Sequence, residues 1–119
     1  EMKYGIGRGK AMDKTLDFNE YQDLADETAI YPEDSQIIYP ALGLASEAGE
    51  VAGKISKALR DDTDYDFDAI ALELGDVLWF LAALASDLGM NLSDIAAMNI
   101  EKLKSRKERG KLQGSGDYR

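Results

Sequence analysis

The sequence predicts an all-α domain, an antiparallel four-helix bundle, from three observations. Four segments carry apolar residues at the three- and four-residue spacing of an amphipathic helix. The connections between them are short and polar, and no segment shows the strict alternation of a half-buried strand. A chain of 119 residues, 45% of them apolar, fits one domain with a modest core, so we expect further copies to complete the bundle.

A proline turn separates the first two predicted helices. The first is expected over about 13–29, capped by Asp13 or Thr15, because the turn 31–34 contains a proline that cannot continue a helix. The second is expected over about 40–60, with its proline in the first turn. Its apolar stripe consists of Leu44, Ala48, Val51, Ala52, Ile55, Ala58 and Leu59.

The last two predicted helices are each bounded by capping residues. The third is expected over about 66–88 and ends at Gly89. Its stripe consists of Ile70, Leu74, Val77, Leu78, Leu81, Leu84 and Leu88. The fourth is expected over about 92–109, with Asn91 or Ser93 as its N-cap.

Both ends of the chain are predicted to lie outside the helical domain, which spans 13–110. Residues 1–12 contain three alternating glycines with no strand before them, so we interpret them as a flexible segment rather than a phosphate-binding loop. Residues 111–119, called the tail below, contain two glycines and should form a loop. Whether either end contacts a ligand stays open.

The composition excludes several kinds of site. The chain has no cysteine and no histidine, so a metal site must use oxygen ligands, which favours Mg²⁺, Mn²⁺ or Ca²⁺. A net charge of −9 argues against binding of nucleic-acid polymers. No apolar run approaches the length of a membrane span, and the start lacks the apolar centre of a signal peptide, so we expect a cytoplasmic protein without a membrane partner.

The net charge is unevenly distributed. Residues 1–98 carry a net charge of −13, and residues 99–119 carry +4. The basic part contains Asn99, Lys102, Arg106 and Arg109 at spacings of three, four and three, which places them on one helical face. We call the three cations the basic stripe. They fit the recognition of a polyphosphate, and the alternative is a solvated helical face.

Two carboxylate pairs provide a candidate metal site. Glu47 and Glu50 lie one turn apart on the second predicted helix, and Glu73 and Asp76 repeat this spacing on the third. On a helical wheel both pairs border their apolar stripes in the same register. Four carboxylates in a small volume repel one another unless hard cations compensate them. The alternative is solvated surface charge.

Further residues extend the candidate site. Lys54 continues the Glu47 face by two turns, and glycines beside both acidic motifs suggest that something approaches closely there. Five residues are candidates for contact with an organic ligand or for packing: Phe18, Tyr21, Gln22, Trp79 and Phe80. Trp79 lies opposite its stripe, which indicates burial against another subunit.

The paired motifs carry a family resemblance. Glu-x-x-Glu and Glu-x-x-Asp, with 22 residues between Glu50 and Glu73, resemble the signature of the MazG-like nucleoside triphosphate pyrophosphohydrolases of the all-α NTP pyrophosphatase superfamily. The resemblance covers about residues 14–119. Many members have a further glutamate where this chain has Ser46, so a fifth acidic ligand or base is not expected here.

The resemblance implies Mg²⁺-dependent hydrolysis, with Mn²⁺ as an alternative, of a nucleoside triphosphate to monophosphate and pyrophosphate. The implied metal-holding and catalytic residues are Glu47, Glu50, Glu73 and Asp76. The implied phosphate or substrate contacts are Lys54, Asn99, Lys102, Arg106 and Arg109. A homodimer or homotetramer is expected. The alternative function is a non-catalytic helical module that binds Mg-nucleotide or a partner protein.

Overall fold

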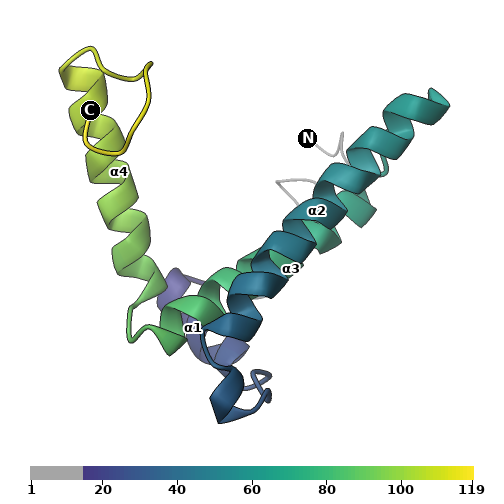
Figure 1. Ribbon diagram of the computed structural model, residues 1–119, viewed down its shortest axis with the longest axis horizontal. Coiled ribbons are helices and arrows are strands. Elements are labelled where there is room, and N and C mark those ends of the chain that lie inside the picture. The colour runs from purple at the N-terminus through teal and green to yellow at the C-terminus, as the bar shows by residue number, and fades with distance from the viewer. Residues whose placement is uncertain (1–14) are drawn as a thin grey trace.

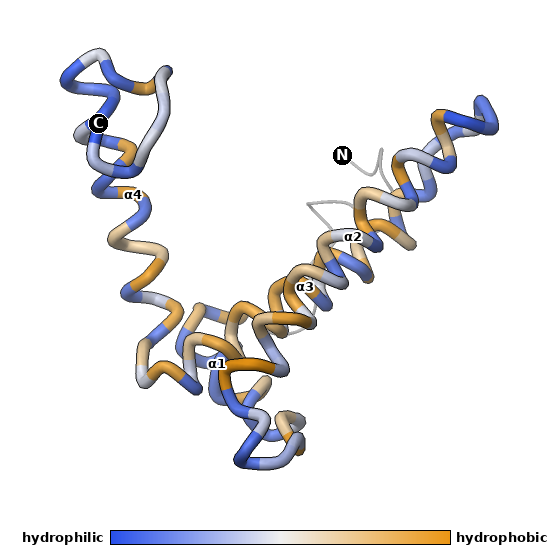
Figure 2. The backbone as a smooth tube through the Cα atoms, viewed as in Figure 1, coloured by the Kyte–Doolittle hydropathy of each residue, from blue (hydrophilic) through white to orange (hydrophobic). Residues whose placement is uncertain are grey.

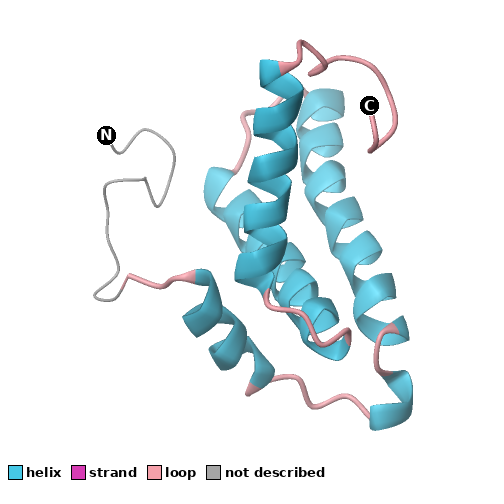
Figure 3. Ribbon diagram, turned by 90° about the vertical axis from the view of Figure 1, so that its left-hand side faces the viewer, coloured by secondary structure: helices cyan, strands magenta, loops and turns pink. Residues whose placement is uncertain are grey.

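A computed structural model describes residues 15–119, and all regular structure within that range is helical (Figures 1 and 3). The expected all-α class is thereby confirmed. The elements are α1 (Phe18–Asp26), the short 3₁₀ helix η1 (Glu33–Ser35), α2 (Ile38–Asp61), α3 (Phe67–Asp87) and α4 (Leu92–Glu108). The expectation for residues 1–12 lies outside the described residues.

The helices α2 and α3 form an antiparallel hairpin, which is the most extensive helix pairing in the chain. Asp62 ends α2 in the left-handed conformation with φ of 52°, and the side chain of Asp66 caps α3 by accepting a hydrogen bond from the Ala69 amide at 3.0 Å. Helix α1 packs on α3 and on α4, whereas α4 diverges from the hairpin, so that the two form the arms of a V in Figure 1. A single chain therefore does not close the bundle.

The predicted helix boundaries are correct to within about two residues except in α1. That helix is shorter than expected, because Asp17 rather than Thr15 caps it by accepting a hydrogen bond from the Glu20 amide at 2.8 Å. The chain then leaves the helix after Asp26, three residues before the expected end. Gly89 and Gly110 end α3 and α4 with φ of 71° and 68°, as the capping argument predicts.

Asp87, the last residue of α3, orders the connection between α1 and α2. Its carboxylate accepts hydrogen bonds from the Tyr31 hydroxyl at 2.8 Å and from the Ile37 amide at 2.9 Å. The pKa of Tyr31 is raised above its ordinary value, mainly because the hydroxyl is buried and in second place because it donates a hydrogen bond to Asp87. Ile37 is held with φ of 68°, a strained conformation for a β-branched residue, directly before α2.

The side chain of Gln22 joins α1 to the turn between α3 and α4. Its amide nitrogen donates to the Ser86 hydroxyl and the Met90 carbonyl, each at 2.9 Å, and its amide oxygen accepts from the Leu92 backbone at 2.8 Å. The residue is only 6% exposed, so these bonds satisfy the polar atoms that burial would otherwise leave unpaired. Gln22 therefore has a structural role.

The core of the single chain is small and rich in alanine. Ala25, Ala82 and Leu92 form its centre, with Tyr21, Leu78 and Trp79 packed against them. Much of the predicted apolar stripes stays partly open to solvent. Figure 2 shows the apolar residues of the helices in orange. Large side chains exposed by more than two fifths include Leu42, Leu59, Leu72, Leu74, Leu88 and Met98. The predicted apolar stripes are therefore only partly covered within the described residues.

The apolar character of α3 corrects one expectation from the sequence. The helix has 21 residues and a window with mean hydropathy 1.7, which meets the length and composition of a membrane span. One such helix is weak support for a membrane segment, because helices that pack inside soluble proteins meet the same criteria. In this chain α3 pairs with α2 and carries Glu73 and Asp76 in its middle.

Gly43 allows the close approach of α2 and α3. A Cβ atom at this position would collide with the Phe80 ring, which is held between Tyr39 and Trp79. We expect Gly43→Ala to lower the free energy of unfolding by about 1–3 kcal/mol, because the ring has to move out of its packed position. Chemical denaturation measures this difference.

Gly53→Ala is the matched control on the same helix, because a Cβ there meets no atom of the described chain within 4 Å. It should raise stability by about 0.5–1 kcal/mol, the usual gain from replacing a helical glycine. Equal effects of the two substitutions would contradict the packing role of Gly43.

Candidate metal and substrate site

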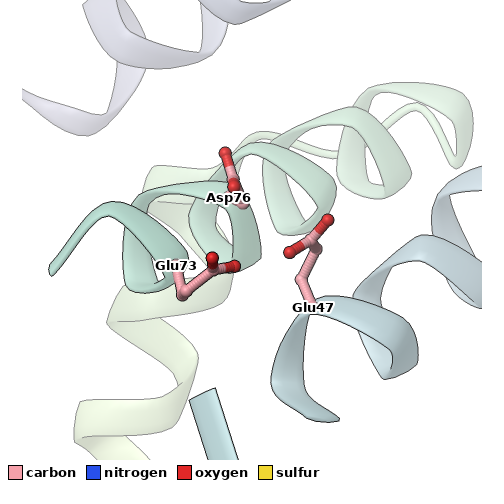
Figure 4. Close-up of side chains that lie close together, drawn as sticks. All are labelled: Glu47, Glu73 and Asp76. Carbon is pink, nitrogen blue, oxygen red and sulfur yellow. The ribbon is translucent and has the colours of Figure 1, made fainter. Parts of the chain in front are cut away.

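Three carboxylates from the hairpin meet on one side of the molecule. Glu47 projects from α2, and Glu73 and Asp76 project from α3 toward it (Figure 4). One oxygen from each residue lies within 4.8 Å of the others. Glu47 and Glu73 are half-buried, and Asp76 is exposed. We call these three residues the carboxylate cluster. The spacing of the paired motifs predicts that carboxylates of these two helices lie close together.

The electrostatics of the cluster are unfavourable without a cation. Desolvation, a hydrogen bond with Glu73 and the negative charges of Asp76, Glu73 and Glu50 together raise the pKa of Glu47. The Lys54 ammonium lies 3.8 Å from the Glu73 carboxylate, and both side chains retain contact with solvent. Such a partly solvated ion pair offsets little of the repulsion.

The donor set fits a hard divalent cation. All three potential ligands are carboxylate oxygens, the type that Mg²⁺, Mn²⁺ and Ca²⁺ prefer, and their mutual repulsion would be relieved by a positive charge between them. Glu47, Glu73 and Asp76 would hold such an ion directly.

Glu50 is not part of this three-residue group. It follows on the next turn of α2, is exposed, and contributes negative charge to the surroundings of Glu47. Its carboxylate is therefore available for another role. The neighbouring glycines do not mark a close approach within the described chain, because a Cβ at Gly49 or Gly75 would meet no atom within 4 Å.

The structure does not bring the basic stripe to the carboxylate cluster of the same chain. Lys102 and Arg106 lie in the C-terminal half of α4 and Arg109 directly follows it, on the arm of the V that diverges from α2 and α3 (Figure 1). Asn99 is exposed on the same helix. Lys54 is the predicted phosphate-binding residue that does lie beside the cluster, through its contact with Glu73.

An aromatic hollow adjoins the carboxylate cluster. It has a volume of about 370 Å³ and is lined by Thr28, Glu47, Asp76, Trp79 and Phe80. The Trp79 indole donates to the Thr28 hydroxyl at 2.8 Å, and its ring meets Phe80 edge-on with centroids 5.0 Å apart. Trp79 thus has packing partners within its own chain and stays half-buried, and its expected placement against another subunit stays a prediction. The spacing of residues in the sequence does not indicate that Thr28 lines this hollow.

The other predicted ligand-contact residues lie outside the lining of this hollow. Gln22 borders a larger hollow of about 450 Å³ between α1 and the turn after α3. Its side chain is fully engaged there with Ser86, Met90 and Leu92. Tyr21 packs on the core, and Phe18 is 45% exposed. The smaller hollow beside the carboxylates is therefore the better candidate for ligand binding.

The fold and the cluster define a helical protein with a candidate oxygen-ligand metal site. Residues 40–110 match the model of the MazG nucleotide pyrophosphohydrolase domain, and the chain belongs to this family. The chain is also similar to the Gene 37 protein of Mycobacterium phage L5, with 45% identity over 83% of this chain and 96% of the relative. No solved structure matches the chain.

Replacement of Glu47 should have opposite effects with and without metal. In metal-free protein at neutral pH, Glu47→Gln is expected to raise the melting temperature, because it removes a charge that its neighbours repel. Since the pKa of Glu47 is raised in the folded state, this advantage exists above the ordinary pKa of a glutamate and disappears as the pH falls below it.

Addition of Mg²⁺ should reverse the order of the two proteins. The wild type gains stability by binding the ion, whereas Glu47→Gln has lost a ligand and gains less. Scanning calorimetry with and without EDTA measures both shifts, with Asp34→Asn as an exposed charge control. A metal-free melting temperature of Glu47→Gln below that of the wild type would contradict the crowding of the carboxylates.

Proposed function

We propose that this protein hydrolyses a nucleoside triphosphate between the α and β phosphorus atoms, releasing a nucleoside monophosphate and pyrophosphate. The observation that carries this proposal is the carboxylate cluster beside an aromatic hollow in a chain of the MazG family. The cluster supplies ligands for the metal that accompanies a triphosphate, and the hollow offers ring faces against which a base can stack.

The residues of the proposed site have separate roles in metal binding, proton transfer and phosphate binding. Glu47, Glu73 and Asp76 would hold a divalent cation, which would neutralise phosphate charge and activate a water molecule. Glu50 stands outside the ligand group, on the turn after Glu47, and takes the proton of the attacking water as general base. The water adds to phosphorus as the α–β anhydride bond breaks, and pyrophosphate leaves. Lys54 is positioned to hold a phosphate oxygen near the cluster.

The remaining cations reach the site from a second copy of the chain. Two observations support this step: the basic stripe diverges from its own carboxylate cluster, and large apolar side chains on α2, α3 and α4 are exposed. Apolar faces of this kind indicate an interface. In the proposed homodimer or homotetramer, Lys102, Arg106 and Arg109 of one copy bind the phosphates held at the cluster of another.

A non-catalytic Mg-nucleotide-binding or partner-binding module is the competing function. It predicts that calorimetry detects nucleotide binding while no pyrophosphate appears. The exposed carboxylate of Glu50 favours the enzyme, because the three-residue cluster alone would suffice to bind a metal-nucleotide.

Loss of single carboxylates should abolish turnover. With Mg²⁺ and a panel of canonical and modified dNTPs, we expect pyrophosphate release to fall by about 100-fold or more in Glu50→Gln and in Asp76→Asn. Glu50→Gln should still bind metal and nucleotide, because it leaves the three ligands in place. A folded wild type that releases pyrophosphate from no nucleotide would contradict the proposal.

Mixed oligomers test the contribution of the second copy. Asp76→Asn and the double variant Lys102→Ala/Arg109→Ala are each expected to be strongly impaired. If acids and cations come from different copies, mixing the two restores up to about one quarter of wild-type activity, because half of random dimers contain one intact site. Mixing Asp76→Asn with Glu50→Gln is the control without recovery. Absence of recovery in the test mixture would place both sets of residues in one copy.

A further inference from the structure

The tail folds back along α4 and covers the basic stripe. Nη2 of Arg106 donates to the carbonyl oxygens of Asp117 at 2.8 Å and Gly116 at 3.2 Å. The Lys102 ammonium lies 3.2 Å from the Asp117 carboxylate, and Arg106 is only 5% exposed. Two cations of the proposed phosphate-binding set are therefore occupied by their own chain.

Arg119 closes the tail into a loop. Its guanidinium donates to the carbonyl oxygens of Lys111 at 3.1 Å, Leu112 at 3.0 Å and Gly116 at 2.7 Å. Its own carbonyl oxygen accepts from Nη2 of Arg109 at 2.8 Å, which connects the loop to the third cation of the stripe. Gly116 has φ of 87°, a conformation that favours glycine. The loop is thus held in place by specific bonds to all three cations.

The tail satisfies the cations incompletely. Nε of Arg106 is buried and has no hydrogen-bond partner in the part of the chain that the structure describes. The Asp117 carboxylate lies 3.5 Å from Nη2 of the same residue, longer than the usual 2.7–2.9 Å of a charge-assisted bond. The aspartate side chain is 77% exposed, so its ion pairs are screened by solvent.

A phosphate group would fit the same cations better. The guanidinium offers a planar fork that binds two phosphate oxygens at once, whereas the tail engages one nitrogen of that fork. Asp117 carries one negative charge, whereas a polyphosphate carries several. The hydrogen bond to Lys102 and the neighbouring Arg106 lower the pKa of the Asp117 carboxyl group. The two ligands compete for the same donors.

We infer that the tail is a displaceable cover over a polyphosphate-binding site on α4, with Asp117 standing where a phosphate group binds. This inference rests on the proposed function, since it takes Lys102 and Arg106 as phosphate ligands. Its consequence is autoinhibition: a polyphosphate reaches the cations by opening the tail, and every contact that closes the tail weakens binding.

Inorganic tripolyphosphate, titrated without divalent metal in a calorimeter, tests the inference directly. Asp117→Asn removes the competing charge, and Arg119→Ala removes three bonds that close the loop without altering α4. Asp117→Asn should bind tripolyphosphate about 3- to 10-fold more tightly than the wild type, the range expected from losing one net hydrogen bond. Arg119→Ala, which loses three bonds, should also bind it more tightly. Lys102→Ala added to Asp117→Asn should cancel the gain.

Asp34→Asn is the matched control, because it removes the same charge from an exposed site between α1 and α2 and should change the affinity less than about twofold. In the wild type, tripolyphosphate should also accelerate hydrogen exchange of the tail amides. Unchanged or weaker binding in both tail variants, no binding in any variant, or added protection of the tail would each overturn the inference. These measurements need no turnover, so a failure of nucleotide hydrolysis contradicts the proposed function separately.

Discussion

Repulsion among three carboxylates on neighbouring helices is the constraint on which the rest of the structure depends. Glu47, Glu73 and Asp76 can lie within 4.8 Å of one another only because the α2–α3 hairpin is held together by packing elsewhere. The contact of Phe80 with the backbone at Gly43 is one such place. Apolar burial along the hairpin thereby offsets an electrostatic cost that the ion pair of Lys54 with Glu73 relieves only slightly. A divalent cation between the three carboxylates would relieve the repulsion that remains.

The same hairpin leaves apolar surface uncovered in the described part of the chain. Helix α3 presents carboxylates and Phe80 toward α2, Trp79 toward the α1–α2 connection, and alanines toward the core. Its leucines stay partly uncovered. Buried alanines contribute little transfer free energy because each removes little apolar surface from water. Much apolar surface of residues 15–119 therefore stays uncovered, and association that buried it would couple stability to the assembly of the site.

The sequence predicted the parts of the fold that depend on local chemistry. Periodicity and capping residues placed α2, α3 and α4, and the matched acidic spacing predicted the meeting of Glu47 with Glu73 and Asp76. It did not predict the role of Gln22, whose partners lie more than sixty residues away, or the cap at Asp17. Those features depend on tertiary contacts or on small differences between neighbouring polar residues, and neither produces a periodic signal.

The structure keeps the acidic and basic regions of the chain apart. The acidic body and the basic stripe do not neutralise each other within one chain, because α4 diverges from the hairpin. Lys102 and Arg106 of the stripe instead form ion pairs with Asp117, an acid from the same basic segment. A single solvated carboxylate is a weak ligand for Lys102 and Arg106, and it leaves a buried guanidinium nitrogen without a partner among residues 15–119. The carboxylate cluster and the basic stripe thus carry charges of opposite sign that the described residues do not neutralise. A metal-bound polyphosphate would offer a cation to the carboxylates and anionic oxygens to the stripe.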